Sequence, residues 1–375
     1  MDRPPFGLYL HVPYCASICG YCDFNTYVAR RGDAGPRGHV DALIAELELA
    51  AAALAEDPRE VSTVFVGGGT PTLLGASELV RLLHGVQERL PLAAGAEVTT
   101  EANPETVDER ALAELRAGGF TRVSIGMQSA APHVLASLER VHTPGASERA
   151  ARDARAAGFE HVSLDLIYGT PGETADDWRR TLDAALSAGP DHVSAYALIV
   201  EPGTRLGAAV AAGRTPAPNP DLLADRYEQA DAALSAAGLG WYEISNWAAG
   251  AASRSRHNDG YWSGGDWWGA GPGAHSTLGG VRWWNERSPR TWAQALAEGR
   301  VPEAGRETPD EDARRLERVM LGIRRVDGLA TGDLDASAAE QLAADGLLDP
   351  AALAAGRAVL TLRGRLLADR VTLTL

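Results

Sequence analysis

The stretch LYLHVPYCASICGYCDFN, residues 8–25, contains all three cysteines of a chain of 375 residues. Cys15, Cys19 and Cys22 are spaced C-x3-C-x2-C and follow an apolar run that is typical of a β-strand. At this spacing, three thiolates on a short loop can converge on one side of a metal centre. Disulfides do not account for the motif, because an odd number of cysteines cannot all pair.

Three cysteines leave a metal centre incomplete. A structural zinc site takes four protein ligands, and only His11 lies near enough in the sequence to be the fourth. An iron–sulfur cluster held by three cysteines instead leaves one iron without a protein ligand, and that iron can bind a small molecule. We therefore predict a cluster whose fourth ligand is a substrate or cofactor, with zinc as the alternative.

The composition is that of an ordinary water-soluble globular protein, with 45% hydrophobic and 23% charged residues. The net charge of −15 argues against a nucleic-acid partner, because phosphate binding requires a basic surface. No apolar run approaches the ~20 residues that cross a bilayer. The first residues also lack the pattern of a signal peptide. We therefore expect a cytoplasmic protein.

The first two thirds of the chain repeat an apolar run followed by a helical stretch. Such repeats are typical of βαβ units in a parallel sheet. Six units are fewer than the eight of a closed TIM barrel, so we predict an α/β fold with a partial (β/α)6 TIM-like barrel. The expected strands are 8–12, 61–69, 96–104, 121–129, 160–169 and 191–200, and the expected helices are 37–56, 76–90, 106–117, 145–157, 174–188 and 219–237.

Polar residues stand late in these strands. In parallel α/β folds, ligands bind at the carboxyl ends of the strands, so these residues should face one common mouth together with the cysteine loop. A single polar strand end can equally be a helix cap or a turn, but six that converge indicate a site. They are His11, Gly67–Gly69, Glu101 with Asn103, Gln128 and Asp165.

The composition changes after residue 240, which divides the chain into three predicted parts. Residues 1–240 form the barrel. Residues 241–300 form an aromatic and glycine-rich extension that contains eight of the nine tryptophans. Residues 301–375 form a small α+β domain, in which a charged helix precedes a terminal hairpin over AVLTLRGRLLADRVTLTL. This arrangement is winged-helix-like, but its acidic character argues against DNA binding.

The C-x3-C-x2-C loop, with Tyr21 before its last cysteine, resembles the radical S-adenosylmethionine (SAM) superfamily. Six further motifs resemble the branch that contains oxygen-independent coproporphyrinogen III oxidase and the HemW heme chaperones. They are GGGTPT (67–72), EANPET (101–106), SIGMQS (124–129), DLIYGTPGET (165–174), HNDGYW (257–262) and GAGPGAH (269–275). The resemblance implies that a [4Fe–4S] cluster binds SAM at its open iron and cleaves it reductively to a 5′-deoxyadenosyl radical.

The same resemblance implies a set of SAM contacts. The glycines would let the backbone approach the methionine end closely, and Arg140 suits a carboxylate, although it could also be a solvated charge at a helix end. Glu101 would accept from amino or ribose groups, and Tyr21 would contact the adenine. The full set is Tyr9, Tyr21, Gly68, Gly69, Thr70, Glu101, Gln128, Arg140, Asp165 and Ile199.

Two functions of different classes fit the resemblance: a heme chaperone of the HemW type and an oxygen-independent coproporphyrinogen III oxidase. The oxidase motif has a fourth cysteine two positions after the third, where this chain has Phe24. The oxidase also carries an N-terminal extension, whereas the first strand here begins at residue 8. Both features favour the chaperone. A HemN-like radical methyltransferase is a third reading.

HNDGYW resembles the motif that the chaperone family uses for heme. An imidazole can bind iron, and aromatic faces can hold a flat macrocycle. The implied heme residues are His257, Asn258, Tyr261 and Trp262, with His275 as a second candidate ligand and Arg254, Arg256 and Arg282 for the propionates. The alternative for His257 is a buried core histidine. Related sequences carry a cysteine where this chain has Ser255, so no thiolate beyond the cluster loop is available to heme.

The resemblance also implies partners. They are heme and respiratory hemoproteins that receive it, some of them membrane-bound, which adds transient membrane association to the expected cytoplasmic location. Nucleic acid is not expected. A homodimer is compatible with the family, although the sequence gives no interface signal. The family also implies that reductive SAM cleavage is chemically available, whereas coproporphyrinogen oxidase activity is not expected.

Overall fold

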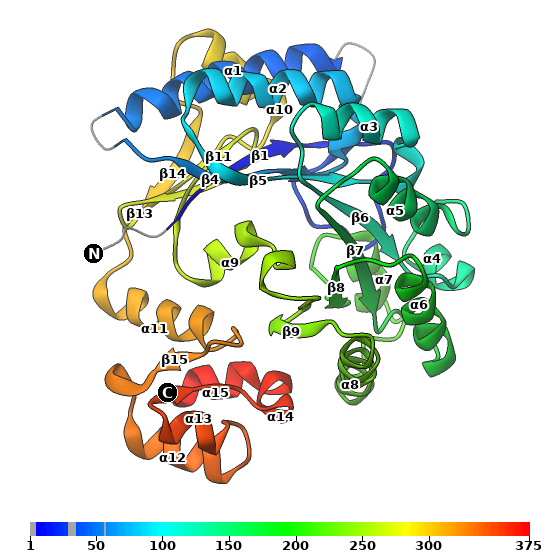
Figure 1. Cartoon of the computed structure of the whole chain (residues 1–375), viewed down its shortest axis with the longest axis vertical. Coiled ribbons are helices and arrows are strands. Elements are labelled where there is room, and N and C mark those ends of the chain that lie inside the picture. Colours follow the sequence, from blue (N-terminus) through cyan, green and yellow to red (C-terminus); the bar gives the residue numbers. More distant parts are fainter. Residues whose placement is uncertain (1–4, 29–34, 56–57) are drawn as a thin grey trace.

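A curved sheet of twelve strands organises the chain, in a computed structural model that describes residues 5–28, 35–55 and 58–375. Its centre is a run of six parallel strands in chain order, which confirms the predicted partial barrel (Figure 1). These strands are β1 (Phe6–Val12), β4 (Val61–Gly68), β5 (Leu92–Ala102), β6 (Arg122–Gln128), β7 (His161–Tyr168) and β8 (His192–Ala197).

The aromatic segment extends both edges of the same sheet. β11 (Asp266–Ala270) pairs in parallel with β1, so the parallel run has a seventh strand that the sequence analysis did not predict. The remaining strands are antiparallel to their neighbours. They are β9 (Gly240–Glu243) and β10 (Asn246–Ala248) beside β8, and β12 (His275–Leu278), β13 (Val281–Asn285) and β14 (Glu303–Glu307) beyond β11.

Tryptophans explain why this segment joins the sheet. Trp247 on β10, and Trp268 and Trp283 on the other edge, belong to the same buried cluster as the aliphatic residues of the central strands. Trp268 and Trp283 meet edge to face with ring centroids 5.1 Å apart. Burying such large side chains is among the strongest contributions to a core. The segment is therefore packed into the barrel wall.

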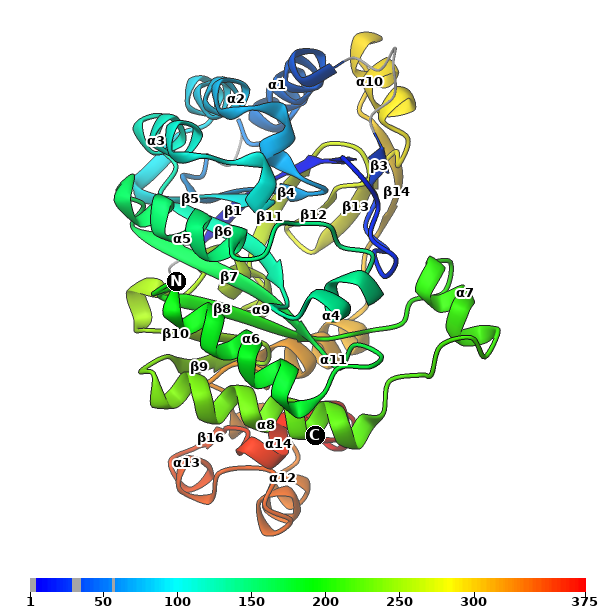
Figure 2. The ribbon, with the colours of Figure 1, turned by 90° about the vertical axis from the view of Figure 1, so that its right-hand side faces the viewer.

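Helices cover the outer face of the curved sheet (Figures 1 and 2). The central ones are α1 (Gly35–Ala53), α2 (Ala76–Arg89), α3 (Glu109–Ala117), α5 (Ala146–Ala156), α6 (Ala175–Ser187) and α8 (Pro220–Ala236). The shorter α10 (Pro289–Ala297) packs beside α1, whereas α4 (Pro132–Ser137) and α7 (Arg205–Ala211) lie on the side where the central strands end (Figure 2). Several begin at polar caps that satisfy free backbone N–H groups; Thr174, for example, forms a capping box with Asp177 at the start of α6.

Strand alternation separates an apolar outer face from a polar inner one. Val64, Val98 and Val123 belong to the buried apolar core beneath the helices. Their strand neighbours Thr99 and Ser124 instead line an internal cavity of about 980 Å³. Side chains alternate between the faces of a strand, so a polar residue at every second position makes the inner face polar. The interior of a complete TIM barrel is normally packed with branched apolar side chains, whereas this one is hollow.

One short helix closes the floor of this barrel. α9 (Arg256–Trp262) lies on the concave side of the sheet, facing β4 and β5 (Figure 1). The Ser255 hydroxyl accepts a hydrogen bond from the Asn258 N–H and caps it. This helix consists of the HNDGYW motif, so the motif is an internal element of the barrel.

The C-terminal part forms a separate small core below the barrel, and the predicted terminal hairpin is wrong (Figure 1). The chain ends in two short helices, 362–366 and 368–374. Thr361 caps the first of these two, and Ala368, Val371 and Thr372 form a buried face at helical spacing on the second. The elements are α11 (Glu311–Gly322), α12 (Ala336–Ala344), α13 (Pro350–Ala354), α14 (Leu362–Leu366) and α15 (Ala368–Thr374), with the two-residue strands β15 (Leu329–Ala330) and β16 (Arg357–Ala358).

A membrane-spanning helix is absent from the described part of the chain, in which every helix is too short or too polar to cross a bilayer.

Candidate functional site

The cavity opens at the carboxyl ends of the parallel strands, and the cysteine loop forms part of its wall. Most of the predicted SAM contacts line it together with the three cysteines. Because the carboxyl ends of parallel strands meet at one edge of the sheet, residues distant in sequence converge here. Those that line the cavity are Cys15, Cys19, Tyr21, Cys22, Gly68, Gly69, Thr70, Glu101, Gln128, Arg140, Asp165 and Ile199.

Each cysteine sulfur has a polar neighbour. The Thr70 hydroxyl donates to Cys15 Sγ at 3.7 Å, and Arg140 Nη1 donates to Cys19 Sγ at 3.8 Å. Cys22 Sγ lies 4.0 Å from the Thr26 hydroxyl. Burial raises the pKa of Cys15 to about 11 and also raises the pKa of Cys22. Without metal, Cys15 and Cys22 therefore carry thiols, and metal binding must release their protons.

A zinc site at the cysteine loop would need His11 as its fourth protein ligand. In the described ranges, no group of three or more His, Cys, Asp or Glu side chains is arranged to hold one metal ion. His11 does not face the cysteines: its Nε2 contacts the Asn25 carbonyl at 3.0 Å and its Nδ1 contacts the Tyr9 hydroxyl at 2.9 Å. These contacts disfavour the zinc alternative.

The glycine-rich GAGPGAH turn, residues 269–275, anchors the cysteine loop. The Asn25 side-chain amide donates to the Pro272 carbonyl, inside GAGPGAH, and to the Arg287 carbonyl, both at 2.9 Å. A Cβ at Gly273 would lie 2.7 Å from the same amide, so the turn accepts only glycine beside it. The GAGPGAH motif thus positions the cluster loop.

The GGGT motif lies directly against the cysteine loop. A Cβ at Gly69 would stand 2.9 Å from Cys15 Sγ and 2.7 Å from the Tyr14 carbonyl. Gly68 has φ = +114°, a conformation that side chains disfavour, and its N–H donates to Glu101 Oε2 at 2.8 Å. Close backbone approach is therefore a property of this turn.

Two partly buried carboxyl groups, those of Glu101 and Asp165, line the cavity. Burial, together with repulsion from Asp165, raises the pKa of Glu101 to about 8. Burial also raises the pKa of Asp165, whose two oxygens both lie 2.9 Å from the Ser124 hydroxyl. Acids with raised pKa values in a cavity mark a site where a cationic ligand would be stabilised.

Arg140 is the cation at the mouth of the cavity. Its Nη2 donates to the Gly126 carbonyl at 3.1 Å, while its Nε is buried without a hydrogen-bond partner among the described residues. A solvated charge at a helix end would not line a cavity in this way, so the geometry favours a binding role. Gln128 lies nearby with φ = +63°, an unusual conformation for a residue with a side chain.

Tyr9 and Ile199 differ from the other predicted SAM contacts. Tyr9 does not line the cavity; it packs under the cavity wall against Phe65 and His257, with ring centroids 6.2 and 6.5 Å away. Ile199 lies beyond the end of β8 and is 65% exposed at the rim. Tyr9 therefore supports the wall, and Ile199 is an exposed edge.

His257, the predicted heme ligand, lies inside the barrel and is 3% exposed. Its Nδ1 is 2.9 Å from the Thr63 hydroxyl and its Nε2 is 2.8 Å from the Tyr261 hydroxyl. Burial lowers its pKa to about 3, so the ring is neutral. Both ring nitrogens have protein partners, and the imidazole must leave one of them before it can bind iron. In this conformation His257 is a buried histidine at the floor of the barrel.

The other predicted heme residues have different surroundings. Asn258 lines the cavity, and Tyr261 packs edge to face on Trp267 at 4.7 Å. Trp262 is hydrogen-bonded to Glu243. The alternative ligand His275 is exposed on β12 and stacks against Trp284, 5.8 Å between centroids.

The three arginines proposed for propionates already have protein contacts. Arg282 forms a two-pronged ion pair with Glu317, and Arg256 donates to the Gly95 carbonyl at 2.6 Å. Arg254 lies over the Tyr242 ring at 5.5 Å.

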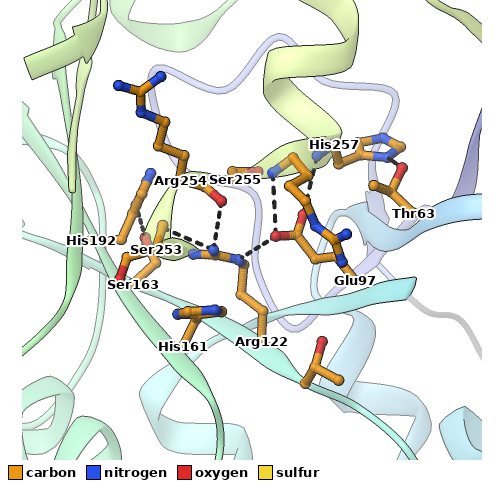
Figure 3. Close-up of polar contacts among 12 residues, drawn as sticks. Thr63, Glu97, Arg122, His161, Ser163, His192, Ser253, Arg254, Ser255 and His257 are labelled. Carbon is orange, nitrogen blue, oxygen red and sulfur yellow. Dashed lines mark hydrogen bonds and ion pairs between the residues drawn. The ribbon is translucent and has the colours of Figure 1, made fainter. Parts of the chain in front are cut away.

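A buried ion pair at the cavity floor was missed in the sequence analysis. Arg122 Nε contacts Glu97 Oε2 at 3.0 Å, and Glu97 accepts the N–H groups of Arg256 and His257 at 3.2 and 3.1 Å (Figure 3). Arg122 Nη2 donates to the carbonyls of residues 253 and 254, both at 2.9 Å. Glu97, Thr99 and Glu101 occupy alternate positions of β5, which places all three side chains on one face of the strand. This alternation is the sequence signal that could have identified Glu97.

Comparisons with known proteins agree with this geometry. Residues 9–185 match the family model of the radical SAM superfamily. The chain is 55% identical to the heme chaperone HemW of Mycobacterium tuberculosis, over all of this chain and 96% of the relative. It is 38% identical to HemW of Escherichia coli, over 73% of this chain and 71% of the relative.

One solved structure matches almost the whole chain. It is the coproporphyrinogen III oxidase HemN of Escherichia coli, a radical SAM enzyme, with a TM-score of 0.83, coverage of 99% of this chain and 90% of the other, and 24% identity. At this level of identity the match shows a common fold and does not transfer an activity.

Proposed function

The chain belongs to the HemW family of radical SAM proteins, and from this premise we propose that it is a heme chaperone that binds a [4Fe–4S] cluster and SAM in the barrel cavity. The observation that carries the proposal is the match to a heme chaperone along the whole chain, at 55% identity. The cavity supports it, because three cysteines and a set of polar strand ends meet at one mouth.

Cys15, Cys19 and Cys22 would hold the cluster, and their number leaves one iron for SAM. When bound, the cluster supplies an open coordination site and a source of electrons for reductive cleavage of SAM. The role of the chain is to hold and shield it. Thr70 and Arg140 donate towards two of the sulfurs, which would stabilise thiolates, and Gly69 brings the backbone against Cys15.

The SAM contacts follow from the charges in the cavity. Glu101 and Asp165 would face the cationic and hydroxyl groups of SAM, and Arg140 would face its carboxylate. Gly68 and Thr70 would let the methionine end approach the backbone, with Gln128 beside the ribose. Tyr21 and Ile199 at the rim would cover the adenine, while Tyr9 would support the wall from behind.

We propose the chaperone over the oxidase because the cluster loop carries Phe24 where the oxidase has a further cysteine. The fold match to HemN keeps the oxidase as a testable second function. Incubation with coproporphyrinogen III, SAM and dithionite decides between them. Formation of protoporphyrinogen IX would contradict the chaperone proposal.

Heme would bind through the α9 motif, with His257 released from the Thr63 or Tyr261 hydroxyl to reach iron. Asn258, Tyr261 and Trp262 would then line the macrocycle. A heme titration followed at the Soret band should show weaker binding and a shifted band for His257→Ala. The exposed His275→Ala is the matched control. A change confined to the His275 variant would move the axial ligand to β12.

The recipients would be respiratory hemoproteins, and delivery to membrane-bound ones would require transient membrane association of a cytoplasmic protein. A homodimer is a further part of the proposal. Transfer of heme from the loaded protein to an apo-cytochrome, followed by absorbance, tests delivery. Size-exclusion chromatography with light scattering tests the dimer.

A further inference from the structure

The floor of the cavity contains a buried cation with one free donor. The Arg122 side chain is 2% exposed and lies in the cavity wall. Its Nε is paired with Glu97, and its Nη2 with two backbone carbonyls (Figure 3). Its Nη1 is buried and has no hydrogen-bond partner within the described residues. Buried donors are nearly always paired, so one left open beside a cavity points to a missing ligand.

A second unpartnered group stands beside it. Thr99 is the register partner of Arg122 between β5 and β6, is fully buried, and also lines the cavity. Its hydroxyl likewise has no hydrogen-bond partner in the described part of the chain. A threonine here is unnecessary for packing, since valine has the same shape and carries no unsatisfied hydroxyl. Two adjacent free donors thus face the same space.

Several other polar groups of the floor are already paired. The Ser163 hydroxyl lies 2.7 Å from His192 Nδ1, and His192 Nε2 lies 2.8 Å from the Tyr242 hydroxyl. Burial holds the pKa of His192 well below its ordinary value, so that ring is neutral. Glu97 accepts from Arg122 and from two backbone N–H groups. Of these described floor groups, Arg122 and Thr99 keep fully buried donors without a partner, Nη1 and Oγ1.

Two neighbouring donors, one of them on a guanidinium, match a group with two acceptor oxygens. A carboxylate is the smallest organic group of this kind, and arginine binds it with charge-assisted hydrogen bonds. The acids nearer the mouth, Glu101 and Asp165, have raised pKa values and would oppose its charge less than ordinary carboxylates. At about 980 Å³ the cavity is near the upper end of ligand sites, roughly 300–1,000 Å³, which leaves room below a ligand at the mouth.

We propose that the barrel floor is a second binding site, in which Arg122 Nη1 and Thr99 Oγ1 hold the carboxylate of a small organic ligand. The site lies deeper than the strand ends that face SAM and does not depend on heme. Its donors belong to rigid parallel strands, so it is formed before the ligand arrives.

The test uses the full-length protein with its cluster and SAM, and acetate as the probe. Saturation-transfer NMR measures acetate binding to the wild type and to Thr99→Val, which removes the free hydroxyl without changing the shape. We expect saturable binding to the wild type, weakened at least about tenfold in Thr99→Val, as loss of a hydrogen bond to a charged group implies. Because the hydroxyl has no hydrogen-bond partner among the described residues, the melting temperature without acetate should stay equal or rise.

Thr100→Val is the matched control. Thr100 is the next residue on β5, is also fully buried, and its hydroxyl is bonded to the Glu101 carbonyl at 3.2 Å. It does not line the cavity, so the substitution should lower the melting temperature and leave acetate binding unchanged. Acetamide, which has the same shape without the charge, should bind more weakly than acetate.

Three results would overturn the proposal. They are the absence of saturable acetate binding to the wild type, equal binding by Thr99→Val, and equal binding of acetamide. A crystal structure of the acetate-soaked protein provides an independent measurement. Acetate bonded to Arg122 and Thr99 supports the site, and water alone at that position contradicts it.

Discussion

Residues at the mouth of the barrel show how much chemistry a short motif specifies. The spacing of the three cysteines predicts a centre open on one side, and the structure adds that each sulfur has a polar neighbour. The environment of His257 could not be predicted, because a histidine in a motif looks the same whether its ring is free or bonded at both nitrogens. The unpaired donors of Thr99 and Arg122 were equally invisible, since burial and pairing depend on the whole fold.

Glu101 gives a pH dependence to the stability of the ligand-free protein. Its pKa is raised from 4.5 to about 8, so the folded protein keeps a proton that the unfolded chain releases. The resulting stability is fully present below about 4.5 and is lost as the pH rises towards about 8. We expect the decline in melting temperature between these pH values to be smaller in Glu101→Gln, which keeps an acceptor for the Gly68 N–H. Parallel curves for the two proteins would show that Glu101 does not carry the proton.

Gly69→Ala tests the close packing at the cluster loop. The added methyl group would lie 2.9 Å from Cys15 Sγ and 2.7 Å from a backbone carbonyl, so the loop must move. We expect a large loss of bound iron after anaerobic reconstitution, measured by iron and sulfide analysis. Gly95→Ala is the control for a glycine without neighbours, although its φ of +69° should lower the melting temperature. Full iron content in Gly69→Ala would contradict the packing argument.

Secondary-structure elements were predicted well where the pattern was long and repeated. The six central strands and their helices follow from apolar runs alternating with helical stretches. β11 was missed because its aromatic residues and glycines do not resemble the aliphatic strands, and only tertiary pairing with β1 reveals its direction. The terminal hairpin was wrong because VTLTL alternates like a strand, whereas the packing of Val371 selects a helix. Tertiary contacts override local pattern in both cases.

The Glu97–Arg122 pair should hold α9 in the barrel. Both side chains are almost fully buried, 3% and 2% exposed, so removal of one leaves an uncompensated charge. We expect Glu97→Ala to lower the free energy of unfolding by about 3–5 kcal/mol. Arg300→Ala breaks an exposed pair with Glu298 and should leave the free energy of unfolding almost unchanged. If urea denaturation gives the same loss of unfolding free energy for both substitutions, the Glu97–Arg122 pair does not hold α9 in the barrel.

The molecule as a whole combines a hollow barrel with a small C-terminal unit that has its own core. Arg365 on α14 connects the two: it forms a two-pronged ion pair with Asp231 on α8, at 2.7 and 3.0 Å, and its guanidinium lies 4.5 Å from the Trp241 ring centroid. From the change in composition after residue 240, the sequence predicts a separate C-terminal part over residues 301–375. It could not predict which surface of the barrel the C-terminal unit contacts.

Arg365→Ala should loosen this attachment. We expect faster hydrogen exchange in α12–α15 with little change in the central strands. Arg363→Ala is the matched control, because Arg363 bonds to the Asp345 carbonyl within the C-terminal unit. Exchange rates that stay at wild-type values in Arg365→Ala would show that other contacts hold the unit.

The central claim is that three cysteines hold a cluster whose fourth position SAM occupies. Electron paramagnetic resonance of the anaerobically reconstituted, dithionite-reduced protein, recorded with and without SAM, tests it most directly. The account predicts about four irons per chain, a reduced-cluster signal that changes when SAM is added, and loss of iron in Cys15→Ala, Cys19→Ala or Cys22→Ala. A signal that SAM leaves unchanged would contradict it.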